Sequence, residues 1–488
     1  MTATAILPGE SISTQETIDK TRERLDRVFD AQMANRFKIA NTSRRERIRK
    51  LKAMLKWIYA NRERIHEAHY ADFKKPGSEV DMSEIFVVTT EIKHAIKHLR
   101  QWMKPEKVPT VLAYATTKAW IRYEPKGVVL IIAPWNFPFN LALGPVVSAV
   151  AAGNCIVLKP SELAPATATL MREMLEELFE ENELAVFEGD KEVSTALLEK
   201  PFHHIFFTGS PAVGKVVARA AAENLASITL ELGGKSPVIV DETANMSDTV
   251  ANIAWGKFIN SGQACIAPDY LFVHESRYDE LVQQLRDKIK AFYGETESER
   301  KASPDFARII SPRHQERLAE MIQDAVGKGA RVEIGGEAET SDKYIAPTVL
   351  TEVPDDSRVM QEEIFGPVLP VRKYTNLDSV LEHINEGEKP LALYIFSGSR
   401  KNQNYILNNT AAGTSCINET MLQFLHPNLP FGGVNNSGFG NSHGWYGFRA
   451  FSHERPVLKH NALSVLKLLY PPYTPFVKKL GELIVKLL

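Results

Sequence analysis

The stretch Gly127-Val128-Val129-Leu130-Ile131-Ile132-Ala133 is a continuous apolar run that leads directly into Pro134-Trp135-Asn136-Phe137-Pro138. An unbroken apolar run rich in β-branched residues is typical of a parallel strand that is buried on both faces. The turn that follows places a polar side chain, Asn136, at the carboxyl end of the strand, where open α/β sheets bind their ligands. The stretch therefore predicts an α/β fold with a site at this edge of the sheet.

Strand-like and helix-like segments alternate after this run. Strands are expected at Cys155–Leu158, Leu184–Phe187 and His204–Phe207, and helices at about Ala166–Glu180 and Ala212–Asn224. This alternation predicts a doubly wound, Rossmann-like sheet. The sequence before it, from about Thr17 to Met103, is charged and helix-periodic, which predicts amphipathic helices.

A second alternation follows Gly233 and predicts a second α/β domain. Its expected strands are Val238–Val240, Leu271–His274 and Tyr394–Phe396, and its expected helices lie near Thr249–Phe258, Tyr278–Phe292 and Pro312–Gly327.

The composition of the 488 residues excludes several classes of protein. Hydrophobic residues make up 44% and charged residues 24%, as in a water-soluble globular protein of two or three domains. Lys plus Arg number 58 against 60 for Asp plus Glu, so there is no basic field to attract nucleic acid. Three cysteines argue for free thiols in a reducing compartment. No secretory signal or membrane span is predicted, and we expect a cytoplasmic protein.

Two segments indicate covalent catalysis. Gly262-Gln263-Ala264-Cys265 places a thiol after a Ser-Gly-Gln turn, and Glu231 ends a strand-like run before two glycines. A thiol and a carboxylate can act as nucleophile and base, and burial at a strand end raises the pKa of a carboxyl. The alternatives are an inert buried thiol and a Glu paired with Lys235. We expect the surroundings of Cys265 to favour its thiolate, and Cys155 and Cys416 to be inert.

Three further segments carry weaker signals. Gly209, Ser210 and Gly214 lie where a predicted strand ends and a helix begins, a place where free N–H groups can bind a pyrophosphate. Their spacing departs from the usual dinucleotide fingerprint, and alone it is a weak signal. Taken alone, Lys159 and Glu162 indicate a solvated salt bridge. Glu363 and Phe365 lie in a turn-rich loop, where a core Phe is the alternative.

Four long motifs in this order resemble the aldehyde dehydrogenase superfamily. They are Pro134–Pro138, Glu231–Pro237, Gly262–Cys265 and Glu362–Pro367. The continuation Cys265-Ile266-Ala267-Pro268-Asp269-Tyr270 is similar to the class 3 branch, the fatty and aromatic aldehyde dehydrogenases. The likeness runs from roughly Phe37 to Pro456.

The resemblance implies roles for these residues. Cys265 would be the nucleophile, Asn136 would hold the oxyanion together with the Cys265 N–H, and Glu231 would activate water. No metal ligands are implied. The cofactor would be NAD, with NADP also allowed, bound by residues spread over the motifs: Trp135, Lys159, Glu162, Gly209, Ser210, Gly214, Gly233, Glu363 and Phe365. Lys159 and Glu162 would bind the adenosine ribose, where a carboxylate repels a 2′-phosphate.

The resemblance also implies an organisation and a reaction. Residues 1–110 and 125–232 would form the NAD(P)-binding domain, residues 233–435 the catalytic domain, and residues 111–124 and 436–460 a small β oligomerisation element of a homodimer. The reaction would be oxidation of a long-chain aliphatic or aromatic aldehyde to the acid through a thioester. The alternatives are an acylating enzyme that passes the thioester to coenzyme A, a simple esterase, and a non-catalytic cofactor-binding protein on the same fold.

The segment Thr474–Leu488 predicts an amphipathic helix. Thr474 can cap it and Pro475 can occupy its first position. Its apolar face would hold Phe476, Val477, Leu480, Leu483, Ile484, Leu487 and Leu488, and its polar face Lys478, Lys479, Glu482 and Lys486. Such a helix either docks on the protein, where in related enzymes it guards the substrate funnel, or lies on a membrane surface.

Overall fold

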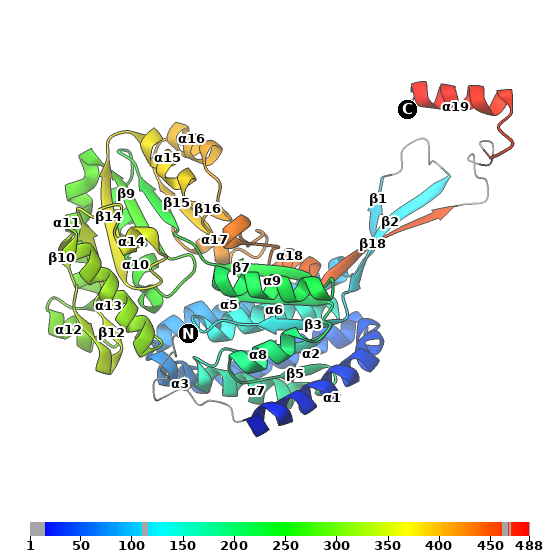
Figure 1. Cartoon of the computed structure of the whole chain (residues 1–488), viewed down its shortest axis with the longest axis horizontal. Helices are drawn as coiled ribbons and strands as arrows, with labels where there is room; N and C mark the ends of the chain where they lie inside the picture. Colours follow the sequence, from blue (N-terminus) through cyan, green and yellow to red (C-terminus); the bar gives the residue numbers. More distant parts are fainter. Residues whose placement is uncertain (1–14, 110–115, 461–466, 468–469, 488) are drawn as a thin grey trace, which may run out of the picture.

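The computed structural model describes residues 15–109, 116–460, 467 and 470–487. Two α/β bodies lie side by side, and a three-stranded sheet projects from one of them toward the C-terminal helix (Figure 1). The predicted fold class, a doubly wound sheet with a second α/β domain and a small β element, is confirmed.

The predicted N-terminal helices are present. They are α1 (Gln15–Ala40), α2 (Arg44–Ala60), α3 (Arg62–Phe73), α4 (Gly77–Val80), the π-helix η1 (Asp81–Ile85) and α5 (Phe86–Trp102). The apolar residues Leu51, Met54 and Ile58 lie on one face of α2 and are buried, as their spacing predicts. Helix α2 begins at a capping box formed by Ser43 and Glu46.

The first sheet has six strands in the order β17-β7-β6-β3-β4-β5. Its strands are β3 (Val128–Ile132), β4 (Cys155–Lys159), β5 (Leu184–Val186), β6 (His204–Gly209), β7 (Ser227–Leu232) and β17 (Gly438–Phe439). Helices α6 (Pro138–Ala152), α7 (Pro165–Leu178), α8 (Lys191–Leu198) and α9 (Pro211–Glu223) belong to it. From β3 the chain proceeds to β4 and β5 on one side, and then to β6 and β7 on the other. The strand order therefore reverses beside β3, and such a switch point is where ligands bind in open α/β sheets.

The second sheet has seven strands in the order β10-β13-β14-β9-β8-β15-β16, and all but β10 are parallel. Its strands are β8 (Pro237–Val240), β9 (Tyr270–His274), β10 (Arg331–Ile334), β13 (Thr348–Thr351), β14 (Val368–Tyr374), β15 (Ala392–Phe396) and β16 (Thr414–Ile417). The helices of this body are α10 (Met246–Phe258), α11 (Glu275–Tyr293), α12 (Glu297–Ala302), α13 (Pro312–Gly327), α14 (Arg358–Gln361), α15 (Leu377–Glu386), α16 (Arg400–Asn409) and α17 (Leu422–Leu425). The expected strands and helices are present, whereas β10, β13, β14 and β16 were not predicted.

The third sheet joins β1 (Glu106–Val108), β2 (Thr117–Pro125) and β18 (Ser452–His460). Part of the predicted strand pair, residues 111–115, lies outside the described residues. The boundary predicted at residue 436 is wrong: β17 pairs with β7 in the first sheet, and α18 (Gly444–Ala450) packs on α5 and α6. Gly438 permits this, because a Cβ there would collide with the Leu230 carbonyl oxygen. The boundary at 110 is also wrong, since β1 belongs to the third sheet.

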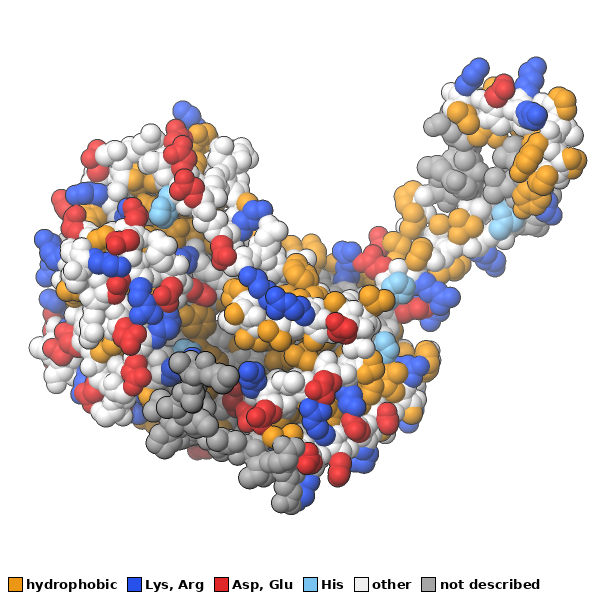
Figure 2. Space-filling model, viewed as in Figure 1, with side chains coloured by type: hydrophobic (Ala, Val, Ile, Leu, Met, Phe, Trp, Pro, Cys, Tyr) orange, Lys and Arg blue, Asp and Glu red, His pale blue; other side chains and the backbone are white. Residues whose placement is uncertain are grey.

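The C-terminal helix α19 (Pro475–Leu487) begins where the sequence predicts, and Val477 N donates to Thr474 Oγ1 at 3.4 Å. The helix lies beyond the third sheet, away from both α/β bodies (Figures 1 and 2). Three of its apolar residues are exposed, with Phe476 at 68%, Leu483 at 52% and Val485 at 83% accessibility, whereas Val477, Leu480 and Ile484 are partly buried. Leu488 lies outside the described residues. None of the helices in the described ranges is long and apolar enough to cross a membrane.

Candidate active site

A polar cleft of about 260 Å³ opens at the switch point of the first sheet and is walled on its other side by the second body. The turns after β3, β6 and β7 contribute to it, as the sequence predicts for the carboxyl ends of these strands. The cleft is lined by Pro134, Trp135, Asn136, Leu141, Thr208, Gly209, Ser210, Glu231, Leu232, Gly233, Cys265, His314, Arg317, Glu363 and Phe365.

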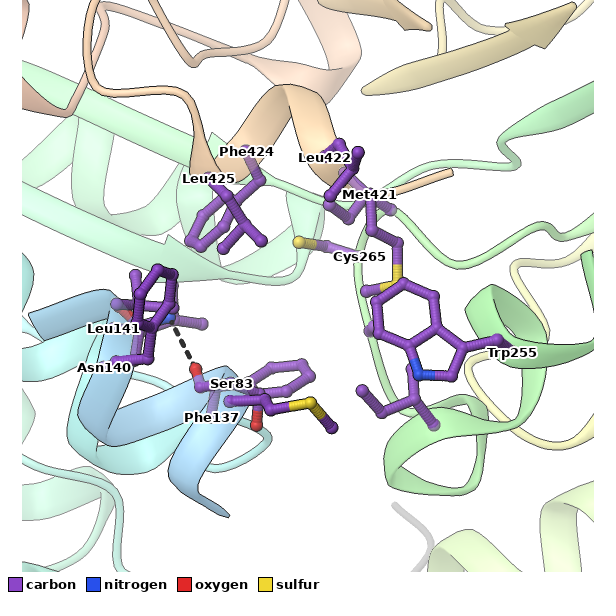
Figure 3. A pocket seen from close by; sticks show the side chains of 16 residues that line it. Ser83, Phe137, Asn140, Leu141, Trp255, Cys265, Met421, Leu422, Phe424 and Leu425 are labelled. Carbon is purple, nitrogen blue, oxygen red and sulfur yellow. Dashed lines mark hydrogen bonds between the residues drawn. The ribbon is translucent and has the colours of Figure 1, made fainter. Parts of the chain in front are cut away.

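An apolar cavity of about 410 Å³ lies against the same cysteine (Figure 3). Met421, Leu422, Phe424 and Leu425 form one wall, and Phe137, Leu141 and Trp255 face them across the opening. Met82, Ser83, Phe86, Val87, Asn140, Ile259, Ala264, Cys265 and Ile266 complete the lining. Cys265 and Leu141 line both the polar cleft and the apolar cavity. A ligand that lies in the apolar cavity can therefore present one end to the thiol and to the polar cleft.

The loop that carries Cys265 is tightly turned. Asn260, Ser261 and Gly262 have positive φ angles of 53°, 52° and 71°. A Cβ on Gly262 would collide with the Gly366 carbonyl oxygen, so glycine is required there. The Gln263 amide fixes the turn, because its Nε2 donates to the carbonyls of Asn260 and Arg308 at 2.9 and 3.0 Å.

Asn136 lies beside this loop although it belongs to the first body. The side-chain Nδ2 of Asn136 donates to the Gln263 backbone carbonyl at 3.0 Å. The backbone carbonyl of Asn136 accepts a hydrogen bond from Asn260 Nδ2 at 2.8 Å. The bond to the Gln263 carbonyl, which satisfies a backbone group, uses one N–H of the Asn136 amide. An Asn amide carries a second N–H, and Asn136 also lines the cleft.

Glu231 is buried at the end of β7. Its Oε1 accepts a hydrogen bond from Ser442 Oγ at 3.0 Å, and burial raises its pKa to about 8, as the sequence analysis expects. The alternative pairing with Lys235 is wrong. Lys235 instead binds Asp269 and donates to the carbonyls of Val359 and Glu362, both at 2.8 Å.

The electrostatics of Cys265 differ from the expectation. Burial, together with the carboxylates of Glu363 and Glu231, raises the pKa of the thiol to about 12, and the nearby N–H groups of Cys265 and Ile266 offset this only in part. The prediction of a thiolate-favouring environment is therefore wrong for the protein without ligands. Burial also raises the pKa of Cys155 to about 12 and that of Cys416. Cys265 is therefore distinguished from the other two cysteines by its position between the polar cleft and the apolar cavity, and not by a lower pKa.

The predicted phosphate-binding segment forms the expected turn. Gly209 ends β6, and Ser210 caps α9, where its Oγ accepts from Val213 N at 3.4 Å. Gly214 lies beneath Leu232, and a Cβ there would approach the Leu232 side chain to 2.7 Å. Gly209 and Ser210 line the polar cleft, whereas Gly214 supports the helix from below.

Glu363 and Phe365 meet the first body across the cleft. A Cβ on Gly233 would collide with the Glu363 carboxylate, so this glycine allows the carboxylate to approach the end of β7. Burial raises the pKa of Glu363 to about 7. The ring of Phe365 lies edge-to-face with Trp135 at 5.3 Å between centroids. Phe365 is thus a wall of the cleft rather than a core residue.

Lys159 and Glu162 lie at the end of β4 and are not on the lining of the cleft. Lys159 Nζ donates to Glu162 Oε2 at 2.6 Å, so the salt bridge predicted from these two residues alone is present. Lys159 is buried, while the Glu162 side chain is 44% exposed.

Several residues of the site were missed by sequence analysis. One is Ser442, which donates a hydrogen bond to Glu231, and two others, Asp269 and Arg317, bind the backbone of the loop that carries Glu363. The apolar cavity is lined by three more, which are Trp255, Met421 and Phe424. Ser442 had no local signal, because its partner is 211 positions away in the chain.

A cleft at the switch point of a doubly wound sheet suits a dinucleotide. Beside it lie a buried carboxyl and a thiol, and the thiol also borders an apolar cavity. This combination of fold and site is that of an oxidoreductase. In agreement with this, residues 4–457 match the sequence model of the aldehyde dehydrogenase family. The chain belongs to that family, and it is an aldehyde dehydrogenase.

Relatives and solved structures resemble nearly the whole chain. It is 44% identical over 436 residues to aldehyde dehydrogenase family 3 member B2 of Mus musculus, covering 89% of each chain. It is 42% identical to 4,4′-diaponeurosporen-aldehyde dehydrogenase of Staphylococcus aureus over 88% of this chain and 92% of that protein. The substrate-bound AldH structure of Staphylococcus aureus has a TM-score of 0.90 and 40% identity, covering 94% of this chain and 99% of that one.

A more distant structure was determined with a cofactor. Glyceraldehyde-3-phosphate dehydrogenase GapN of Methanocaldococcus jannaschii, complexed with NADP, has a TM-score of 0.82 and 26% identity and covers 90% of this chain and 95% of that one.

Proposed function

We propose that this enzyme oxidises long-chain aliphatic or aromatic aldehydes to carboxylic acids with NAD or NADP, through a thioester on Cys265. The observation that carries the proposal is the position of Cys265 between an apolar cavity of about 410 Å³ and a polar cleft. A cavity of this size and lining suits an apolar ligand whose polar end reaches the thiol.

The residues of the polar cleft fit a dinucleotide. The turn after β6 offers the N-terminus of α9 to a pyrophosphate, and Gly209 and Gly233 line the cleft beside it. Ser210 would contact the phosphates, Glu363 the nicotinamide ribose, and Phe365 and Trp135 the nicotinamide side of the cleft. When bound, NAD(P) supplies the acceptor for the hydride that leaves the aldehyde carbon.

Cys265 and Asn136 would act in the first half of the reaction. The thiol gives its proton to solvent water, and its sulfur forms a bond to the carbonyl carbon, while the electron pair of the C=O bond moves to the oxygen, which gains the negative charge. One N–H of Asn136 and the N–H of Cys265 would donate to that oxygen. Such a donor is generally worth about 3–4 kcal/mol in the transition state. Loss of the hydride then leaves a thioester.

Glu231 would act in the second half. Its carboxylate takes a proton from water, the hydroxide oxygen bonds to the thioester carbon, the C–S bond breaks, and the acid leaves. An acylating enzyme would pass the thioester to coenzyme A and would need no such base. The buried carboxyl beside Cys265 therefore favours hydrolysis. Formation of NADH and free acid from aldehyde and NAD without coenzyme A tests the proposal, and an absolute requirement for coenzyme A would contradict it.

The substrate class is tested with aldehydes of graded length. We expect kcat/KM to rise from acetaldehyde through hexanal to long-chain and aromatic aldehydes, because each buried CH₂ contributes about 0.8 kcal/mol. The measurement is the initial rate of NADH formation at low substrate concentration. A flat or falling series would contradict an apolar binding site for the chain.

Glu162 is proposed to favour NAD over NADP, because a carboxylate at the adenosine ribose repels the 2′-phosphate. We predict that Glu162→Gln raises the NADP/NAD ratio of kcat/KM by roughly threefold to tenfold, a modest effect because this carboxylate is half-exposed. Glu173→Gln, which removes another surface carboxylate that pairs with Arg64 at 2.6 Å, is the matched control and should leave the ratio unchanged. A wild-type preference for NADP of about tenfold or more would refute the assignment.

A homodimer is also proposed. The strands β2 and β18 project from the body as a sheet with largely exposed or half-buried residues, including Leu458 at 61% exposure. A sheet of this kind gains stability from a partner surface. Light scattering should give the mass of two chains, and the mass of one chain would contradict the proposal.

Helix α19 is proposed to bind an apolar surface outside its own subunit, which is either the mouth of the partner's cavity or a membrane surface; in the second case the enzyme would be attached peripherally to the membrane. Its exposed Phe476, Leu483 and Val485 support this, and Lys478, Lys479 and Lys486 suit anionic lipid.

Deletion of residues 475–488 separates these two roles. Loss of co-sedimentation with anionic liposomes indicates membrane contact, and a changed kcat/KM for a long-chain aldehyde indicates a role at the cavity. Phe476→Glu is a milder variant that keeps the helix. If neither readout changes in either variant, the helix has no part in binding or catalysis.

A further inference from the structure

Two buried polar atoms beside Cys265 have no hydrogen-bond partner within the part of the chain that the structure describes. They are Oε2 of Glu231 and Nε2 of His443. Both side chains, with those of Cys265 and Ser442, line a cavity of about 30 Å³. This cavity has room for a water molecule, and a buried polar atom without a partner is destabilising. A water that binds both atoms is therefore favoured.

The surroundings of His443 fix its ring. Phe424 and Phe431 lie edge-on to the imidazole, with centroids at 4.6 and 5.6 Å. On the side away from Nε2, the Nδ1 atom lies 4.0 Å from Oε2 of Glu91, whose other oxygen accepts a hydrogen bond from Gly444 N. An ionised Glu91 favours the tautomer with the proton on Nδ1. That tautomer leaves Nε2, which has no partner among the described residues, as an acceptor.

The charge of the ring agrees with an acceptor role. Burial lowers the pKa of His443 to about 4, so the imidazole is neutral near pH 7. Burial raises the pKa of Glu91 to about 7, so its ionised form, which sets the tautomer, predominates above that pH. The other titratable groups near the ring are Glu231 and Cys265 in the cavity and His94 of α5, which lies beside Gly444.

We propose that His443 positions the water that hydrolyses the thioester. Its Nε2 and Oε2 of Glu231 each accept one hydrogen of a single cavity water, which turns a lone pair of the oxygen toward the carbon bound to Cys265. Glu231 then takes one proton, the oxygen bonds to the carbon, and the C–S bond breaks with the electron pair on sulfur. His443 keeps its own proton throughout, and Glu91 is a positioning residue that sets its tautomer.

This inference rests on the proposed function, because only a thioester at Cys265 needs such a water. The test compares wild type, His443→Ala, His443→Gln and Glu91→Gln, with His98→Asn as a matched control from a histidine outside the site. Single-turnover NADH formation reports the steps before hydrolysis. Steady-state turnover, with and without hydroxylamine, reports hydrolysis, because hydroxylamine cleaves a thioester without an activated water.

In His443→Ala we expect single-turnover NADH formation within about twofold of wild type and steady-state turnover slowed about tenfold or more. Hydroxylamine should restore much of that turnover. His443→Gln, whose amide oxygen can accept, should recover part of it, and Glu91→Gln should lose activity mainly through the second step. Unchanged steady-state turnover, or a parallel fall of both steps without rescue by hydroxylamine, would overturn the inference. The absence of an acyl adduct on Cys265 in Glu231→Gln would instead refute the thioester itself.

Discussion

Cys265→Ala is expected to lower aldehyde oxidation by about 10⁴-fold or more, because removal of a nucleophile leaves only binding and oxyanion contacts. No other thiol can replace it. Cys155 lies inside β4, and Cys416 lies on β16, so neither lines the polar cleft or the apolar cavity.

The matched controls are Cys155→Ala and Cys416→Ala, which should keep most of the activity. Binding of the cofactor to Cys265→Ala, measured by fluorescence quenching, would show that this variant is folded. Since burial raises the pKa of all three thiols, reactivity toward thiol reagents alone does not identify the nucleophile. Substantial oxidation by Cys265→Ala would refute covalent catalysis at this residue.

Glu231→Gln is expected to separate the two halves of the reaction. The variant keeps the shape of the side chain and can still accept the hydrogen bond from Ser442, but its amide cannot take a proton from water. We predict a burst of about one NADH per active site, followed by turnover slowed about 10²-fold or more. Stopped-flow absorbance measures both phases. Loss of the burst itself would mean that Glu231 takes the proton of the thiol.

The wild-type pH profile follows from the same residue. Burial raises the pKa of Glu231 to about 8, and only the ionised carboxylate can act as a base. Where hydrolysis limits the rate, kcat should therefore rise with pH and level off above about 8. In Glu231→Gln that limb of the profile should disappear.

Parts of this site could be predicted because their signals are local. The run Val128–Ile132 forms a strand buried on both faces, as its unbroken apolar sequence indicates, and Asn136 follows it at the switch point. The meeting of Asn136 with Cys265 could not be derived from spacing. It depends on Asn260 and Gln263, because each of them makes one hydrogen bond to Asn136, and two further side-chain hydrogen bonds join these two residues to each other.

Other parts of the structure could not be predicted, because their local sequence either indicates a different structure or carries no signal. Strand β14 contains Pro370, Arg372 and Lys373, which interrupt the apolar pattern of a buried strand. The sequence around His443 carries no catalytic signal, because a loop histidine usually has satisfied hydrogen bonds. Its Nε2 lies in the cavity of Glu231 and has no partner among the described residues, and only the three-dimensional arrangement reveals this.

The measurement that tests the account most directly is the mass of Glu231→Gln after a single exposure to NAD and a long-chain aldehyde. The account predicts that the intact chain gains the mass of one acyl group, that peptide mapping places it on Cys265, and that hydroxylamine removes it. A NADH burst without an acyl adduct, or an adduct on a residue other than Cys265, would contradict the proposed thioester.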